Sequence, residues 1–280
     1  MTEEYADLKG VKICYEIRGD GDPLILIHGF GTTKNDWKLA QVDTLSEKFK
    51  IIIFDNRGAG KSDHPNEPYL MEIFADDTNA LMEYLKIEKA HILGSSLGGM
   101  IAQTFAINYP NRINKLILIN TTPSFPSNPS GIEMYKRNKI TKYNAILKDP
   151  EKAFWEYGIS GFSRNFKKML QENPKKKFHG LFSAEDMMKE MINDPSTPQD
   201  SENQTNALMH YNVLNKLHTI KSESLIITAT HDRTLPKMLS EKIHEKIPNS
   251  KLIVIEKAGH GSPLEKAPEI NQYIIDFLKN

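Results

Sequence analysis

The chain has 280 residues, of which 26% are charged and 39% hydrophobic, a composition typical of globular proteins. Lys and Arg (36) balance Asp and Glu (36), so net charge gives no reason to expect nucleic acid or an anionic membrane as partner. A single cysteine, Cys14, excludes an internal disulfide and a multi-thiolate metal site. Because no apolar run reaches the roughly 18 residues of a membrane span, and because residues 1–7 lack the apolar core of a signal peptide, we expect a cytoplasmic protein with no membrane span.

The first part of the chain alternates short apolar runs with helical patterns. Residues 11–17 alternate apolar and polar side chains, as a half-buried strand does. Four further runs are continuously apolar and predict strands buried on both faces: 24–27, 50–54, 90–93 and 113–119. Apolar residues at helical spacing predict helices over 70–85 and 97–109.

The alternation of predicted strands and helices stops after the fifth predicted strand. Residues 121–131 form a Pro- and Ser-rich hinge, and residues 131–219 are Lys-rich with helical patches and no strand run. The alternation then resumes, with strands at 225–229 and 252–255 and helices at 236–247 and 270–278. Such alternation predicts a mostly parallel sheet. We expect a core formed by residues 1–120 and 221–280, with residues 121–220 inserted as a helical cap.

The strongest motif is Gly94-Ser95-Ser96-Leu97-Gly98, between a predicted buried strand and a predicted helix. A G-x-S-x-G string alone is weak evidence, but this position is where a sharp strand-to-helix turn lifts a serine hydroxyl above a sheet. The two glycines would allow the close backbone approach that this turn needs. Ser96, the central serine, is therefore the candidate nucleophile, against the alternative of an ordinary Gly- and Ser-rich turn.

A serine nucleophile needs an adjacent base, and the base needs an acid to orient it. Asp232 follows the strand at 225–229, and His260 lies in a Gly-flanked loop after the strand at 252–255. Loops at the carboxyl ends of parallel strands meet at one edge of the sheet, so the two side chains can converge on Ser96. His231 is the best rival for the base, but the chain order serine, acid, histidine favours His260.

Acyl transfer also needs N–H groups that stabilise the developing oxyanion. We expect one from Leu97, directly after the nucleophile, and the other from Phe30 in the loop after the strand at 24–27. His28, at the start of that loop, is interpreted as a packed structural side chain. Candidate substrate-binding residues are Trp37, Trp155 and Phe162, although packing alone could also account for these aromatic side chains.

Residues 55–62 end in Gly-Lys-Ser and superficially suggest a phosphate-binding loop. The motif requires Gly where this chain has Asp55, and Pro65 interrupts the helix that should follow. We therefore interpret the segment as a structural loop. Metal-ligand spacings of His and Cys are absent from the sequence, so neither a metal nor a cofactor is expected.

Taken with the loops at 28–31 and 55–62, the Ser96 motif, Asp232 and Gly259-His260 make the chain resemble the α/β-hydrolase fold family, in its lidded branch. The resemblance covers about residues 1–120 and 221–280 and implies an eight-stranded, mostly parallel sheet flanked by helices, with a helical cap over the serine. The family includes carboxylesterases, enol-lactonases, C–C bond hydrolases and cofactor-free haloperoxidase-like enzymes. Its epoxide hydrolases and dehalogenases use an aspartate nucleophile, which Ser96 argues against.

The sequence thus predicts a serine esterase of carboxylesterase type that hydrolyses a small-molecule ester or related acyl bond through an acyl-enzyme. One alternative is a C–C bond hydrolase of diketones with the same triad. Arg164, Lys167 and Lys168 could then bind a substrate carboxylate, although a solvated helix face is the simpler interpretation. The other alternative is a ligand-binding protein without turnover, because function resides in the site and not in the fold. No motif indicates the natural substrate or the oligomeric state.

Overall fold

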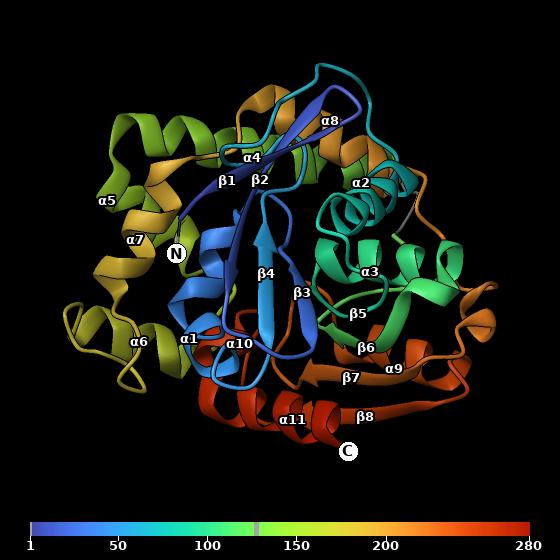
Figure 1. Cartoon of the computed structure of the whole chain (residues 1–280). Coiled ribbons are helices and arrows are strands. Elements are labelled where there is room, and N and C mark those ends of the chain that lie inside the picture. The colour runs from blue at the N-terminus through green and yellow to red at the C-terminus, as the bar shows by residue number, and fades with distance from the viewer. Residues whose placement is uncertain (1, 126–128) are drawn as a thin grey trace.

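Eight strands form one sheet in the computed structural model, which describes residues 2–125 and 129–280 (Figure 1). The strand order is β1-β2-β4-β3-β5-β6-β7-β8. β2 pairs antiparallel with β1 and β4, and every other neighbouring pair is parallel, which confirms the predicted sheet. The strands are β1 (Glu4–Leu8), β2 (Val11–Arg18), β3 (Pro23–Ile27), β4 (Lys50–Phe54), β5 (Ala90–Ser95), β6 (Ile113–Ile119), β7 (Glu223–Ala229) and β8 (Ser250–Ile255).

Helices cover both faces of this sheet. On one face, Ile25, Ile27 and Ile52 share a core with α2 (Met71–Tyr84), α3 (Leu97–Asn108) and α9 (Lys237–Lys246). On the other face, Leu24, Leu26, Ile51 and Ile53 share a core with α1 (Val42–Leu45) and α11 (Ala267–Lys279). Successive side chains of a strand point to opposite faces. The continuous apolar runs therefore exist because both faces of these strands are covered by helices.

The edge strand β1 was not predicted. Its burial alternates, and only Ala6 and Leu8 are buried, so its apolar content was too low to distinguish it from a polar terminus. Its pairing with β2 gives the sheet an antiparallel edge. The short helical elements outside residues 129–209 were likewise not predicted: η1 (Lys34–Leu39), α1, η2 (Pro110–Arg112), η4 (Leu217–Thr219) and α10 (Ser262–Glu265).

Residues 129–209 carry the remaining helices and, as described, no strand. These are α4 (Pro129–Lys148), α5 (Pro150–Ala153), the π-helical turn η3 (Phe154–Gly158), α6 (Arg164–Glu172), α7 (Ala184–Asn193) and α8 (Pro198–Met209). Phe154, Phe166 and Phe182 of this segment belong to a small third core, to which Ala40 and Ala267 also contribute. In Figure 1, α4 and α8 lie across the top of the view. The predicted hinge at 121–131 extends too far, because α4 begins at Pro129; residues 126–128 of it lie outside the described residues.

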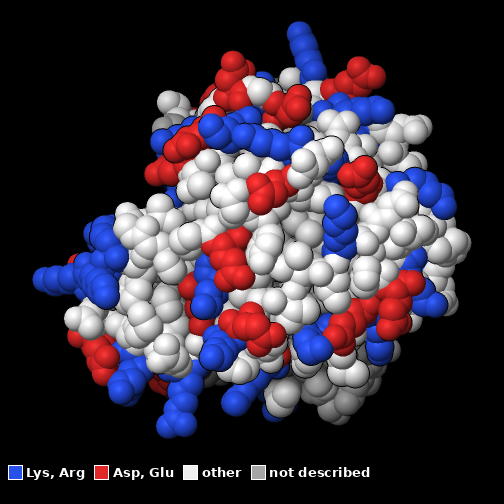
Figure 2. Space-filling model, turned by 90° about the horizontal axis from the view of Figure 1, so that it is seen from below, with Lys and Arg blue, Asp and Glu red and all other residues white. Residues whose placement is uncertain are grey.

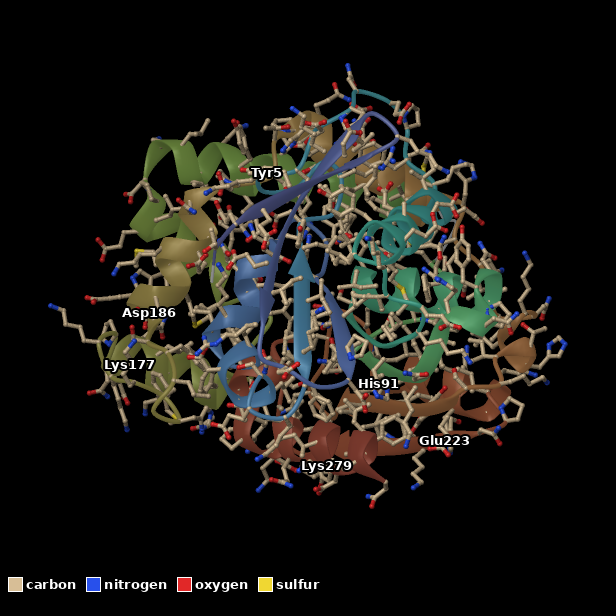
Figure 3. The ribbon with its side chains drawn as sticks, viewed as in Figure 1. Tyr5, His91, Lys177, Asp186, Glu223 and Lys279 are labelled. Atoms are coloured by element: carbon tan, nitrogen blue, oxygen red, sulfur yellow. The ribbon has the colours of Figure 1, made fainter. Side chains whose placement is uncertain are left out.

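Charged side chains are distributed over the surface without a dominant sign on the face that Figure 2 shows. Figure 3 shows Lys177 and Asp186 together at one side of the molecule, away from His91 and Glu223. Lys177 Nζ lies 2.5 Å from Asp186 Oδ2 and so forms an ion pair at the start of α7. None of the helices in residues 2–125 and 129–280 is long and apolar enough to cross a membrane.

Candidate active site

Ser96 occupies the sharp turn between β5 and α3. Its φ of 56° and ψ of −119° are a strained conformation for a residue other than glycine, of the kind that clusters at functional sites. Gly94 and Gly98 make it possible, because a Cβ on Gly94 would lie 2.1 Å from the Gly98 oxygen. A Cβ on Gly98 would lie 2.0 Å from the Ile27 oxygen. Only glycine fits at either position, and the hydroxyl-bearing residue is held between them.

Side chains from three separate loops meet at this turn. Ser96 Oγ lies 3.0 Å from Nε2 of His260, and Nδ1 of His260 lies 2.7 Å from Oδ2 of Asp232. The residues follow β5, β7 and β8, whose carboxyl ends share one edge of the sheet. A carboxylate only accepts hydrogen bonds, so Nδ1 donates to Asp232 and Nε2 is left to accept the Ser96 proton.

Asp232 is held in place by backbone as well as by His260. Its Oδ1 accepts hydrogen bonds from the N–H groups of Thr234 (2.8 Å) and Leu235 (2.9 Å), and its side chain is fully buried. This leaves Oδ2 for the imidazole. The rival base His231 is exposed and uses its backbone N–H to bond Ala258.

The two candidate oxyanion donors, Phe30 and Leu97, belong to two separate segments that come close to Ser96. Leu97 is the first residue of α3, where backbone N–H groups have no partner within the helix. Phe30 belongs to the loop after β3, and this loop reaches the nucleophile, because a Cβ on Gly29 would lie 3.5 Å from the Ser96 Cβ. An oxyanion at this point would also face the positive end of the α3 dipole.

Two further residues hold the His260 loop, and sequence reasoning missed both. Asn120 Nδ2 donates to the His260 carbonyl oxygen at 2.7 Å. Glu265 Oε2 accepts from the N–H groups of Gly259 and Ser163, both at 3.1 Å, and Oε1 accepts from the Ser163 hydroxyl. Asn120 directly follows β6 at the same sheet edge, and that position was its available signal. No sequence pattern pointed to Glu265, because acidic residues near short helices are common on protein surfaces.

A cavity of about 540 Å³ opens onto Ser96 and His260. Phe30, Trp37 and Phe162 line it, together with residues of α4 and α7. Trp155 is not among its lining residues; it packs edge-on against Phe154, with ring centroids 4.9 Å apart. The sequence pattern could not separate these aromatic residues, because π-helical η3 changes which side chains of that segment face inward.

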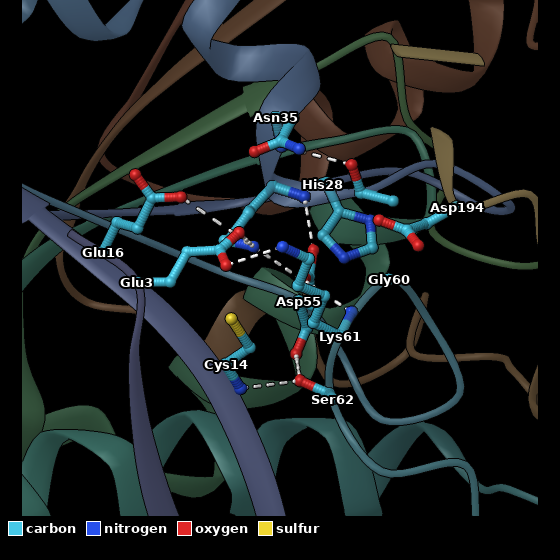
Figure 4. Close-up of polar contacts among 12 residues, drawn as sticks. Glu3, Cys14, Glu16, His28, Asn35, Asp55, Gly60, Lys61, Ser62 and Asp194 are labelled. Atoms are coloured by element: carbon cyan, nitrogen blue, oxygen red, sulfur yellow. Dashed lines mark hydrogen bonds and ion pairs between the residues drawn. The ribbon is translucent and has the colours of Figure 1, made fainter. Parts of the chain in front are cut away.

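The loop after β4 holds a buried charge network instead of a phosphate. Asp55 accepts from the backbone N–H and Nζ of Lys34 at 2.8 and 2.9 Å, and Lys34 Nζ also lies 3.9 Å from Glu16 (Figure 4). Lys38 Nζ lies 2.5 Å from Glu16 as well. Burial opposes the charge on Lys34, but Asp55 more than offsets it and raises the pKa of Lys34. A Cβ on Gly60 would lie 2.5 Å from the Asp55 carboxyl, so the loop wraps that side chain tightly.

His28 and Cys14 are structural parts of this region. His28 is 2% exposed; its Nε2 accepts the Asn56 N–H at 3.0 Å, and Nδ1 lies 2.9 Å from the Gly29 oxygen. Burial lowers the pKa of His28, which keeps it neutral. Cys14 is fully buried, and burial raises the pKa of its thiol. Among residues 2–125 and 129–280, no cluster of His, Cys, Asp or Glu could hold a metal ion.

The mixed sheet, the strained serine turn and the connected side chains together define an α/β-hydrolase architecture. A family model described as the alpha/beta hydrolase fold matches residues 22–267, and the chain belongs to that family.

Relatives of this chain carry different activities. It is 28% identical, over 287 residues, to a 2-hydroxymuconate semialdehyde hydrolase of Pseudomonas sp. strain CF600, covering 96% of this chain and 91% of that one. The enol-lactonase structure from Burkholderia xenovorans LB400 superposes with a TM-score of 0.82 at 22% identity, covering 99% of this chain and 100% of that one. A bromoperoxidase from Bacillus anthracis gives a TM-score of 0.82 at 25% identity, with both chains fully covered. Because these names differ, the substrate has to be argued from this chain's own residues.

Proposed function

We propose that the protein is a serine hydrolase that cleaves carboxylic esters or related acyl bonds. The single observation that carries the proposal is the continuous chain of hydrogen bonds from Ser96 Oγ through the His260 imidazole to Asp232, since Ser96 and His260 also line the cavity. A protein that only binds a ligand has no use for a serine held next to a base in a strained turn.

In the proposed reaction, His260 Nε2 takes the Ser96 proton as Oγ attacks the ester carbonyl carbon. The resulting oxyanion is stabilised by the N–H groups of Phe30 and Leu97. His260 then gives its proton to the leaving alcohol, which departs and leaves an acyl group on Ser96. Water, deprotonated by His260, attacks the acyl-enzyme and releases the acid. Asp232 holds the imidazole in the required tautomer and stabilises its cationic form.

The direct test replaces Ser96 with Ala. Turnover of a chromogenic ester should fall by about a thousandfold or more, because the acyl-enzyme cannot form. A fluorophosphonate probe should label the parent once, on Ser96 and not on Ser95. The matched control is Ser222→Ala, in the loop before β7 at the opposite edge of the sheet, which should keep parent turnover. A Ser96→Ala protein that melts normally and still turns over ester at the parent rate would refute the nucleophile.

The second candidate is cleavage of a C–C bond beside a ketone with the same three side chains. It is favoured by the similarity to a hydrolase named for 2-hydroxymuconate semialdehyde, a compound with no ester bond. A chain-length series of chromogenic esters assayed beside a vinylogous diketone distinguishes the two: an ester rate far above the diketone rate supports the first candidate, and the reverse order supports the second. No turnover of either, with Ser96 unreactive, would point to a binding protein.

A further inference from the structure

One cation lies inside the cavity in an arrangement that catalysis by Ser96 does not require. Lys139, on α4, lines the same cavity as Ser96 and His260. Its ammonium nitrogen lies 4.8 Å from the ring centroid of Phe30 and 5.0 Å from that of Tyr135. The two rings meet edge to face with centroids 5.1 Å apart, so they form a shelf that fixes the lysine.

Lys139 forms no ion pair with a carboxylate among the described residues, whereas two other cations of α4 do. Lys136 Nζ lies 2.5 Å from Glu202, and Arg137 Nε lies 3.1 Å from Glu133. Burial and, as the smaller effect, the charge of the nearby Lys142 together lower the pKa of Lys139 to about 7. A partly buried ammonium without a counter-ion is unfavourable, and an anion that enters the cavity would reduce that penalty.

Besides Lys139, the charged side chains that line the cavity are one lysine, Lys142, and three carboxylates, Asp36, Glu190 and Asp194. The pKa of Asp36 is raised to about 6, chiefly by burial. The charge of Lys142 opposes this rise, and the charge of Glu190 adds to it. Burial likewise lowers the pKa of Lys142, and Asp36 opposes that shift. The charge that acts on Lys142 is therefore that of a carboxylate, Asp36, whereas the charge that acts on Lys139 is that of another lysine, Lys142. Lys139 would attract an anion, whereas the carboxylates Asp36, Glu190 and Asp194, which line the same cavity, would repel it and so favour contact with Lys139.

Phe30 connects this cation to the reacting carbonyl. Its backbone N–H is the proposed oxyanion donor, and its ring is the surface on which the Lys139 ammonium lies. We propose, on the basis of the serine hydrolase function above, that Lys139 binds a free carboxylate of the substrate. The substrate class is then the monoester of a dicarboxylic acid, or a lactone with a carboxylate, whose acyl carbon reaches Ser96 while the carboxylate reaches Lys139.

The test compares three esters that differ only in the charge at the far end of the acyl chain. These are an aryl monoester of glutaric acid, its isosteric primary amide, and an analogue with a terminal trimethylammonium group. We expect the parent to prefer the anion over the amide by about tenfold or more in kcat/KM, which is the effect of one buried charge-assisted hydrogen bond. Equal rates for anion and amide, or preference for the cation, would overturn the proposal.

Variants locate this preference on α4. Lys139→Met should abolish the preference for the anion, and Lys139→Arg should keep it. Lys136→Met, a matched lysine on the same helix outside the cavity, should behave as the parent does. In the parent, the KM of the anionic ester should rise as pH rises through about 7, because neutral Lys139 no longer attracts an anion. Lys139→Arg should lack that rise, since a guanidinium stays charged.

Binding to the inactive protein separates this proposal from the proposed function. Calorimetry of monomethyl glutarate with Ser96→Ala should show an affinity that the added change Lys139→Met reduces by about tenfold or more. That result would support the carboxylate site even if no ester were hydrolysed. Equal binding to the single and double variants would reject it even if esters were hydrolysed quickly.

Discussion

The positive φ of Ser96 is possible because Gly94 and Gly98 carry no Cβ. Gly29, which also lies beside Ser96, is packed less tightly. A Cβ on Gly98 would collide with the Ile27 oxygen at 2.0 Å, whereas a Cβ on Gly29 would meet its nearest atom, the Ser96 Cβ, at 3.5 Å. The first distance is a collision with rigid backbone, and the second is an ordinary van der Waals contact. Two glycines of one site therefore tolerate substitution very differently.

Gly98→Ala should destabilise the protein by about 2–4 kcal/mol, because either the turn or the end of β3 must move. Gly29→Ala should change the unfolding free energy by less than about 1 kcal/mol. Denaturant unfolding of the two variants measures both values. Similar stabilities for the two would show that the turn is not packed against β3 as closely as described.

Among individual site residues, the sequence allowed the prediction mainly of those that follow a predicted strand. Ser96, Asp232 and His260 could be predicted because each lies just beyond a buried apolar run, and such runs are legible in a sequence. Lys139 could not, because it is one lysine in a Lys-rich helix and its surroundings depend on how α4 lies over the sheet. Trp37 and Trp155 gave identical signals, yet only Trp37 lines the cavity.

Among the elements, the His260 loop is tied to α6 through a single buried carboxylate. Glu265 accepts the N–H of Gly259, next to the base, and the N–H and hydroxyl of Ser163, which also caps α6. The helix that supports the cavity wall and the loop that carries the base therefore share one anchor. We infer that Glu265 is a positioning residue for His260.

Glu265→Ala should destabilise the protein by about 2–4 kcal/mol, since it leaves two buried N–H groups without partners. Glu265→Ala should also lower kcat far more than it raises KM. If Glu265 were only structural, the variant would contain less folded enzyme, and the folded molecules would keep the parent KM and pH profile. Glu265→Gln, which keeps an oxygen acceptor, should restore most of kcat. The exposed Glu269→Ala is the control in the same region.

The boundaries of elements were predicted less well than their existence. Continuous apolar runs located β3, β4, β5 and β6 to within a residue or two. β1 was not predicted because an edge strand buries only one face. The predicted hinge at 121–131 overlapped the start of α4, because Pro129 suggested a hinge although proline suits a first helical turn. The arrangement of the helices from α4 to α8 depends on tertiary packing, and no local pattern encodes it.

In the molecule as a whole, α8 attaches the helical segment to the loop after β4. His64 Nδ1 lies 2.8 Å from Asp200 Oδ1, and Gln204 Nε2 donates to the Gly58 oxygen at 2.8 Å. Asn206 Nδ2 adds a bond to the Tyr69 oxygen at 2.9 Å. These contacts fix the segment that carries Lys139 relative to the sheet that carries Ser96.

The His64–Asp200 pair gives this attachment a pH dependence. The hydrogen bond to Asp200 raises the pKa of His64, so the pair stabilises the fold fully below the ordinary histidine pKa, and this contribution is lost as pH rises through the raised value. The effect should be small, because the His64 side chain is 39% exposed. An NMR titration should show the His64 pKa falling in Asp200→Asn but not in Glu202→Gln on the same helix. An unchanged His64 pKa in Asp200→Asn would contradict the pairing.

The single buried thiol makes the protein convenient for spectroscopy. Cys14 is buried in the core, and burial raises the pKa of its thiol, so maleimide dyes should not label the folded native protein under mild conditions. A cysteine introduced at the exposed Met134, on the same helix as Lys139, would then be the unique attachment point for a fluorophore. Such a label could follow in real time whether that helix shifts when an acidic ligand enters, without the native sulfur having to be removed first.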